Sequence, residues 1–250
     1  MPPEIIALLV AAAFVAGLVD AVAGGGGLLT VPALLLTGMP LPQVLGTNKG
    51  QAVFGVAAAL TSFWRAGRID KKRVGTLFGC GFGGALLGAW LVGQLRPEVL
   101  RPLVLALLVL VAAVLAFRPK LQDRPPPPLA QVTLRAALIA GVIGTYDGFF
   151  GPGTGTFLIM ALALWLGDTL IAASAHAKVV NFASNLAAVS LFAAQGQVQW
   201  RLALPMAVGQ ALGATVGARW AIKRGNQLVR QVVLAVVLAL AAKMAWQLGQ

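Results

Sequence analysis

The sequence predicts an all-α polytopic membrane protein made of two inverted repeats, each with about five helical segments. Three observations support this fold class. Hydrophobic residues make up 59% of the 250 residues and charged residues 10%, whereas a soluble domain carries about 25% charged residues. A glycine-rich motif with an aspartate and a later lysine occurs twice, and matching loops of the two halves carry opposite charge bias. Such a chain is suited to lipid and not to water.

The first half begins with an apolar run at residues 5–23, which is long enough to cross a bilayer. The preceding MPPEII contains an acid and no basic region, so we expect a retained helix and not a cleaved signal. Glycines at 24–27 break this helix. Residues 28–36 are too few to span, which predicts a half-helix or part of a re-entrant hairpin. Spanning runs follow at residues 44–64, 74–95 and 99–117.

A proline-rich basic segment divides the chain. Residues 118–135 contain four consecutive prolines and four basic residues, which predicts a stiff, solvated linker. After this segment the pattern of the first half starts again. We therefore expect a first transmembrane repeat at residues 1–117, a cytoplasmic linker at 118–131 and a second transmembrane repeat at 132–250.

The repeat is visible when the chain is aligned with itself. At a shift of 127 residues the first glycine-rich motif falls on the second, and after two extra residues the shift becomes 129. The charged pairs carry the most information in a chain rich in glycine and alanine. They are Asp20 with Asp147 and Lys49 with Lys178. The other identical pairs are Gly17/Gly144, Gly24/Gly151, Gly26/Gly153, Phe63/Phe192, Gly67/Gly196, Gly84/Gly213, Gly88/Gly217 and Arg101/Arg230.

The charge of the loops predicts that the repeats are inverted. The loop at 65–73 carries five basic residues and its copy at 195–201 carries one; the loop at 96–101 carries two and its copy at 219–230 carries four. Because basic loops favour the cytoplasm, matching loops lie on opposite sides of the membrane. With 65–73, 118–135 and 219–230 inside, 13 of the 19 basic residues are cytoplasmic. Both termini then face outward.

Each glycine break predicts a polar cavity within the membrane. A break leaves backbone N–H and C=O groups unpaired, which lipid tolerates only where they face protein or a watery cavity. A helix that starts just past Gly155, or after the matching glycines of the first half, directs its free N–H groups into that cavity. Such a helix end attracts anions. Inverted repeats that meet at broken helices near the midplane are typical of secondary transporters.

Two lysines and two aspartates are repeated within this apolar sequence. A lysine at the bilayer centre costs about 2.5–3.5 kcal/mol on insertion scales, so a repeated pair indicates a compensating role. Either Lys49 and Lys178 counter a substrate anion, or each lies near an interface with its ammonium group in water. Asp20 and Asp147 either cap a helix or pair with a lysine of their own or the opposite repeat, or one takes up a proton and couples transport to the proton gradient.

His176 is the only histidine and stands where the first half has Thr47. It either packs with a hydrogen-bond partner or lines the cavity and titrates. Asn181 and Asn185 share a helix face with Lys178, where they contact a ligand or join helices. The predicted substrate-binding residues are Lys49, Lys178, Asn48, Asn181, Asn185, Gly26, Gly27, Gly153, Thr154, Gly155 and Thr156, and the candidates for proton coupling are Asp20, Asp147 and His176.

Other classes of function find no support in the sequence. Basic loops account for the net charge of +12 and no nucleic-acid motif is present, so we expect no nucleic-acid partner. Cys80 is the only cysteine, which excludes a disulfide framework and a cysteine metal site. We expect no metal and no cofactor. Without an HExxH, GxSxG or paired-carboxylate arrangement, we also expect no enzyme.

The specific motifs are GLVDAVAGGGGLLTVPALL and GTNK in the first half, and GTYDGFFGPGTGTF, ASAHAKVVNFASNLAA and FAAQGQVQW in the second. Through them, over nearly its whole length, the chain resembles the sulfite exporter TauE/SafE family of membrane permeases, also called the TSUP family. The resemblance implies a multi-pass protein of the bacterial inner membrane that carries sulfite, sulfoacetate, related sulfonates or other small organic anions, often as an exporter. His176 departs from the family pattern, in which we expect threonine.

We therefore expect a secondary transporter that exports small anions, such as sulfite or organosulfur and sulfonate compounds, from a midplane site between the repeats. An anion channel and a permease for small carboxylates are the alternatives. A membrane enzyme or scaffold would need catalytic groups or a docking domain that the sequence lacks. The expected partners are the small anion and the lipid bilayer, and a homodimer is left open.

Overall fold

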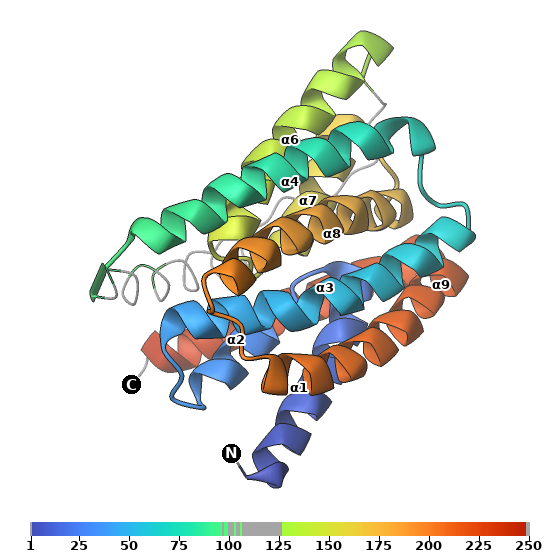
Figure 1. Ribbon diagram of the computed structural model, residues 1–250. Coiled ribbons are helices and arrows are strands. Elements are labelled where there is room, and N and C mark those ends of the chain that lie inside the picture. Colours follow the sequence, from blue (N-terminus) through green and yellow to red (C-terminus); the bar gives the residue numbers. More distant parts are fainter. Residues whose placement is uncertain (1, 97, 100–102, 104–105, 107–126, 249–250) are drawn as a thin grey trace.

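The structure is a computed structural model that describes residues 2–96, 98–99, 103, 106 and 127–248, and every regular element in these ranges is a helix (Figure 1). Side chains are described for the same residues except 129–130 and 226–248. The all-α fold class is confirmed. The predicted segment at 99–117 and the linker at 118–131 lie largely outside the described residues.

The first half contains α1 (Pro3–Ala23), α2 (Gly27–Leu35), α3 (Leu41–Arg65) and α4 (Lys71–Gln94). These bounds agree with the predicted runs to within a few residues. The helix α1 ends at Gly24, which has a φ of +75° and donates its N–H to the Asp20 carbonyl at 2.9 Å. Glycine adopts this left-handed conformation without steric cost. The helix α4 begins where the Asp70 carboxylate accepts the Lys72 N–H at 3.0 Å, a typical N-cap.

The second half contains α6 (Leu129–Phe149), α7 (Thr154–Leu166), α8 (Leu170–Ala194) and α9 (Trp200–Leu248). The helix α9 is broken at Gly225, whose φ of 65° and ψ of −152° are not helical. It therefore consists of two helices joined at a kink. With α6, α7 and α8 these make the five helical segments predicted for this half.

Equivalent helix pairs occur twice in the structure, and each pair joins a helix of the first half to a helix of the second. The helix α1 packs along α9 as α6 packs along α4, and α3 contacts α9 as α8 contacts α4. The equivalent helices α3 and α8 contact each other at the centre and run in opposite directions (Figure 1). An inverted repeat requires both features. How the halves are oriented relative to a bilayer stays a prediction.

The helices that follow the glycine breaks are short. The helix α2 has 9 residues and α7 has 13, or about 13 and 20 Å at 1.5 Å per residue. A hydrocarbon core is about 30 Å thick, so both are half-helices. Among the described residues, α1, α4 and α8 are long and apolar enough to cross a membrane. The polytopic character of the chain rests on these three.

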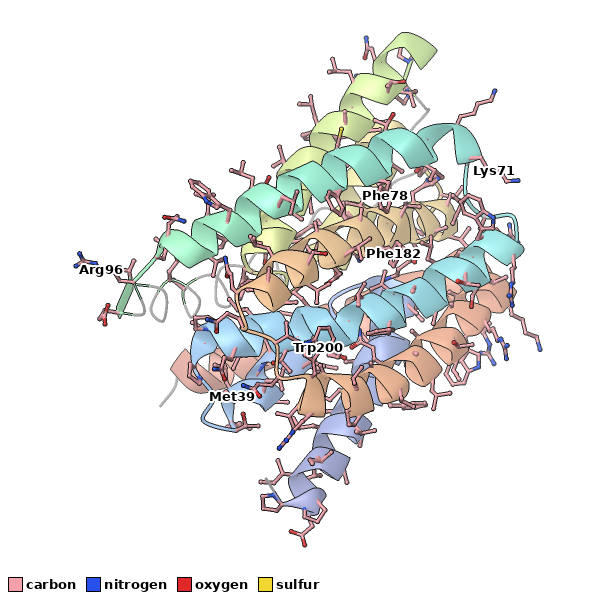
Figure 2. The ribbon with its side chains drawn as sticks, in the orientation of Figure 1. Met39, Lys71, Phe78, Arg96, Phe182 and Trp200 are labelled. Atoms are coloured by element: carbon pink, nitrogen blue, oxygen red, sulfur yellow. The ribbon has the colours of Figure 1, made fainter. Side chains whose placement is uncertain are left out.

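Polarity is distributed in the manner of a protein that lies in lipid. Large apolar side chains cover the outside; Leu36 is 89% exposed and Leu8 is 70% exposed. Lys49 and Lys178 are instead among the largest fully buried side chains, at 2% and 0%. Aromatic side chains also fill the joint between α4 and α8, where the rings of Phe78 and Phe182 lie 6.3 Å apart (Figure 2). The apolar outer surface is suited to lipid, and these two charged side chains lie inside.

Glycines allow the closest helix contacts. A Cβ atom at Gly88 of α4 would lie 2.0 Å from the Thr145 carbonyl oxygen of α6, and one at Gly213 of α9 would lie 1.9 Å from the Phe14 carbonyl oxygen of α1. These two glycines hold different places in the repeat, where Gly88 matches Gly217 and Gly213 matches Gly84. Any side chain at either position would force the helix backbones apart.

We predict that Gly88→Ala destabilises the protein by about 1–3 kcal/mol or more, because its methyl group overlaps backbone that cannot move aside. Gly83→Ala is the matched control on the same helix, since a Cβ there meets nothing within 4 Å. It should be neutral or stabilising by up to about 1 kcal/mol. Thermal unfolding of the purified protein in detergent measures both variants, and equal melting temperatures would contradict the packing described.

Candidate functional site

The two glycine breaks are in direct contact. A Cβ atom at Gly24 would lie 2.2 Å from the Gly155 carbonyl carbon, and one at Gly155 would lie 2.6 Å from the Gly24 Cα. The Thr156 hydroxyl donates to the Ala23 carbonyl at 2.9 Å and holds the start of α7 against the end of α1. The breaks of the two halves therefore meet at one place, next to the central helices α3 and α8.

A pocket lies at this meeting point, and we call it the central pocket. Its empty volume is about 390 Å³, part of which opens to solvent. Sites for small molecules are typically clefts with a few convergent polar groups. The central pocket is lined by Asp20, Gly25, Gly26, Gly27, Asn48, Lys49, Gln51, Ala52, Val56, Asp147, Gly151, Thr154, Gly155, Asn181, Asn185 and Gln210.

Most of the predicted site residues line the central pocket. The exceptions are Lys178, Gly153, Thr156 and His176. Two polar lining residues were missed by the sequence analysis, Gln51 of α3 and Gln210 of α9. Each lies within a largely apolar helix, and Gln51 lies only two positions from Lys49. That proximity was the available signal.

Two buried ion pairs cross between the halves. Lys49 Nζ lies 2.8 Å from Asp147 Oδ1, and Lys178 Nζ lies 2.9 Å from Asp20 Oδ2. In each pair the lysine of one half binds the aspartate of the other, and we call them the crossed ion pairs. Each aspartate therefore pairs with the lysine of the opposite repeat and not with that of its own. When all four groups are ionised, their charges cancel.

Each aspartate also contacts the start of the half-helix that follows it. Asp20 Oδ1 accepts the Gly26 N–H at 3.2 Å, just before α2. Asp147 Oδ1 accepts the Thr154 hydroxyl at 2.9 Å, at the start of α7. Carboxylates are favoured at the positive end of a helix. The two helix ends that we expected to attract a substrate anion therefore already face protein carboxylates.

Neutral polar groups complete the wall of the central pocket. Asn48 Oδ1 accepts the Thr30 hydroxyl at 2.6 Å and the Gln51 amide nitrogen at 3.2 Å. Asn185 donates its amide nitrogen to the Asn181 carbonyl at 2.6 Å. The wall thus combines donors, acceptors and ionised groups. Within the described residues, no group of three histidine, cysteine, aspartate or glutamate side chains could hold a metal ion.

His176 lies outside the central pocket, at the start of α8. Its Nδ1 lies 2.8 Å from Asp168 Oδ2, and its Nε2 accepts the Asp70 N–H at 3.0 Å. Arg73 donates to the other oxygen of Asp168 at 2.8 Å and lies 3.4 Å from the Asp70 carboxylate. Because Nε2 accepts a hydrogen bond, the ring is neutral with its proton on Nδ1. His176 therefore ties α8 to the loop before α4.

The other end of the bundle has an equivalent hydrogen bond. Thr47 stands at the position that matches His176, and its hydroxyl accepts the Gln199 N–H at 3.0 Å. Gln199 matches Asp70 at the same shift of 129 residues. These two bonds lie near opposite ends of the 25-residue helix α3; Lys71, beside Asp70, and Met39, before α3, mark the two ends in Figure 2.

Comparison with known proteins gives a consistent result. The family model described as sulfite exporter TauE/SafE matches residues 9–244. A probable membrane transporter protein of Haemophilus influenzae is 38% identical over 206 residues, which cover 82% of this chain and 81% of the relative. The probable membrane transporter protein YfcA of Escherichia coli K12 is 36% identical over 210 residues, covering 83% and 77%. No solved structure matches significantly.

We predict that breaking one crossed ion pair destabilises the protein more than removing it. Lys178→Met leaves the Asp20 carboxylate buried without its partner, which costs about 3–5 kcal/mol. Adding Asp20→Asn removes that charge and keeps an acceptor for the Gly26 N–H, so the double variant should recover most of the loss. A double-mutant cycle of unfolding in detergent measures this coupling. Additive effects of the two substitutions would contradict the pairing.

We also predict that loss of the imidazole releases the Asp70 amide but not the Gln199 amide. His176→Leu removes the acceptor of the Asp70 N–H, so Asp70 should lose up to about tenfold of its protection from hydrogen exchange relative to Gln199, as expected for one hydrogen bond. His176→Gln keeps an acceptor at this position and should retain most of the protection. Equal protection of Asp70 in the unmodified protein and in His176→Leu would refute this role.

Proposed function

This chain belongs to the sulfite exporter TauE/SafE family of membrane transporters, and we propose that it exports small anions, sulfite or organosulfur and sulfonate compounds, across the bacterial inner membrane. In this proposal the anion binds in the central pocket, between the two inverted repeats and near the middle of the bilayer. The chain acts as a secondary transporter and not as an enzyme.

The observation that carries this proposal is the Lys49 ammonium group in the wall of the central pocket. It lies beside the starts of both half-helices and is only 2% exposed. A buried ammonium group binds an oxyanion more strongly than one in water, because the local dielectric constant is low. Lys49 is therefore the group that we propose binds the substrate. Lys178 does not line the pocket and acts indirectly, through its ion pair with Asp20.

The charge balance of the pocket supports a role for a proton. With both crossed ion pairs ionised, an entering anion adds a negative charge that no protein cation offsets. If Asp147 takes up a proton, Lys49 is released and the balance is restored. We propose that anion binding and protonation of Asp147 occur together. His176 is bound to Asp168 at the start of α8 and takes no part in this step.

Export is the direction that the membrane potential favours for an anion that moves alone. The cytoplasm of a bacterium is negative, and each elementary charge gains about 2.3 kcal/mol per 100 mV on leaving it. Movement of a monovalent anion with one proton would cancel this gain. The concentration gradients of the anion and of the proton would then be the driving force. Measuring charge and proton movement together separates these two cases.

We predict that Lys49→Met lowers sulfite efflux from proteoliposomes by about 10- to 100-fold, as expected for loss of one hydrogen bond to a charged group. Asp147→Asn should keep sulfite binding, because Lys49 is then free, but should abolish the rise of internal pH that accompanies efflux. Efflux and a trapped pH dye are recorded in the same vesicles. Lys72→Met, which alters an exposed lysine at the start of α4, is the matched control.

Efflux that Lys49→Met leaves unchanged would remove this lysine from the mechanism. Efflux that rises linearly with sulfite concentration, without saturation or proton movement, would identify a channel instead of a transporter. If sulfite fails to move and small carboxylates saturate the protein, the substrate class proposed here is overturned.

A further inference from the structure

Three buried amide oxygens of residues that line the central pocket have no hydrogen-bond partner among the described residues. They are Gln51 Oε1, Asn181 Oδ1 and Gln210 Oε1. The three residues lie on α3, α8 and α9 and are 0%, 4% and 3% exposed. All three line the same pocket. Buried polar atoms of native proteins nearly always have a partner, so unpaired acceptors from three helices in one pocket call for an explanation.

The orientation of Gln51 follows from its neighbours. Its amide nitrogen donates to Asn48 Oδ1, which also accepts the Thr30 hydroxyl at 2.6 Å. Since Asn48 presents its oxygen to Gln51, Gln51 must present its nitrogen in return, and its own oxygen is left without a donor. A carbonyl oxygen can only accept hydrogen bonds. The missing partner of Gln51 is therefore a donor.

The central pocket consequently has two kinds of wall. Once Asp147 takes up a proton, as proposed above, the Lys49 ammonium group supplies donors and a positive charge. The three amide oxygens supply acceptors only. An oxyanion without protons is itself only an acceptor, so it pairs with the first wall and leaves the second unpaired. A ligand that satisfies both walls carries an anionic group and a hydrogen-bond donor on the same molecule.

We propose that the preferred substrate is a small organic anion that also bears a hydroxyl or ammonium group, and not a bare oxyanion. This inference rests on the function proposed above and narrows its substrate class. A sodium ion is the other species that amide oxygens could hold. We favour a donor on the substrate, because one molecule then pairs with both the Lys49 ammonium group and the amide oxygens.

Three probes of equal chain length test the inference with the purified full chain in detergent. Propane-1-sulfonate has a methyl group where 2-hydroxyethanesulfonate has a hydroxyl and 2-aminoethanesulfonate has an ammonium group. We expect at least one of the donor-bearing probes to bind about tenfold or more tightly than propane-1-sulfonate, because a site built around unpaired polar groups rejects a ligand that leaves them unpaired. Titration calorimetry and ligand-dependent melting temperatures measure the three affinities.

Replacing the amides by methionine tests whether their oxygens cause the difference in affinity between the probes. Gln51→Met and Gln210→Met keep the length of the side chain and remove the acceptor, so each should reduce the advantage of the donor-bearing probes to about threefold or less. Gln43→Met is the matched control on α3. Gln43 pairs with Gln199 outside the central pocket, and its substitution should leave the ratio of affinities unchanged. If both pocket variants fail to fold, the comparison of probes on the unmodified chain still decides the matter.

The outcomes separate this inference from the proposed function. If sulfite or propane-1-sulfonate binds as tightly as the donor-bearing probes, the inference is overturned while the anion transporter stands. If sodium chloride, compared with choline chloride, raises the melting temperature without an organic ligand and Gln51→Met abolishes the effect, the oxygens hold an ion and the inference is overturned. If none of these anions binds or crosses proteoliposomes, the proposed function itself falls.

Discussion

The crossed ion pairs are the interaction on which the rest of the structure depends. Each half contributes a lysine that the other half neutralises, because Lys49 reaches Asp147 and Lys178 reaches Asp20. A buried charge without its partner is strongly destabilising. Neither half can therefore bury its own polar groups alone. The pairing holds the two glycine breaks together, and the central pocket lies at their junction.

The same four charges link the fold to transport. Because the aspartates bind both the opposite lysine and the adjoining half-helix, a change of protonation at Asp147 would act on Lys49 and on the start of α7 at once. A relative movement of the two halves would exchange these polar contacts at the pocket, although apolar packing also joins the halves along α1 and α9. Alternating access in transporters built from inverted repeats uses such movements around a fixed site.

Much of the fold was predictable because its signals are local. Apolar runs, glycine breaks and a repeated Asp and Lys are visible in the sequence, and the helices from Pro3 to Gln94 follow the runs closely. The choice of partner for each lysine was not predictable, since an aspartate of either half satisfies the same charge. Gln51 and Gln210 were missed because an amide in a largely apolar helix is as typical of a helix contact as of a binding site.

The hydrogen bonds at Thr47 and His176 hold equivalent backbone positions at the two ends of α3, but they differ in chemistry. A threonine hydroxyl accepts the Gln199 amide at any physiological acidity, whereas an imidazole accepts the Asp70 amide only while it is neutral. The two ends of this nearly symmetric molecule therefore differ in their chemistry. The fold therefore acquires a direction that its architecture alone does not have.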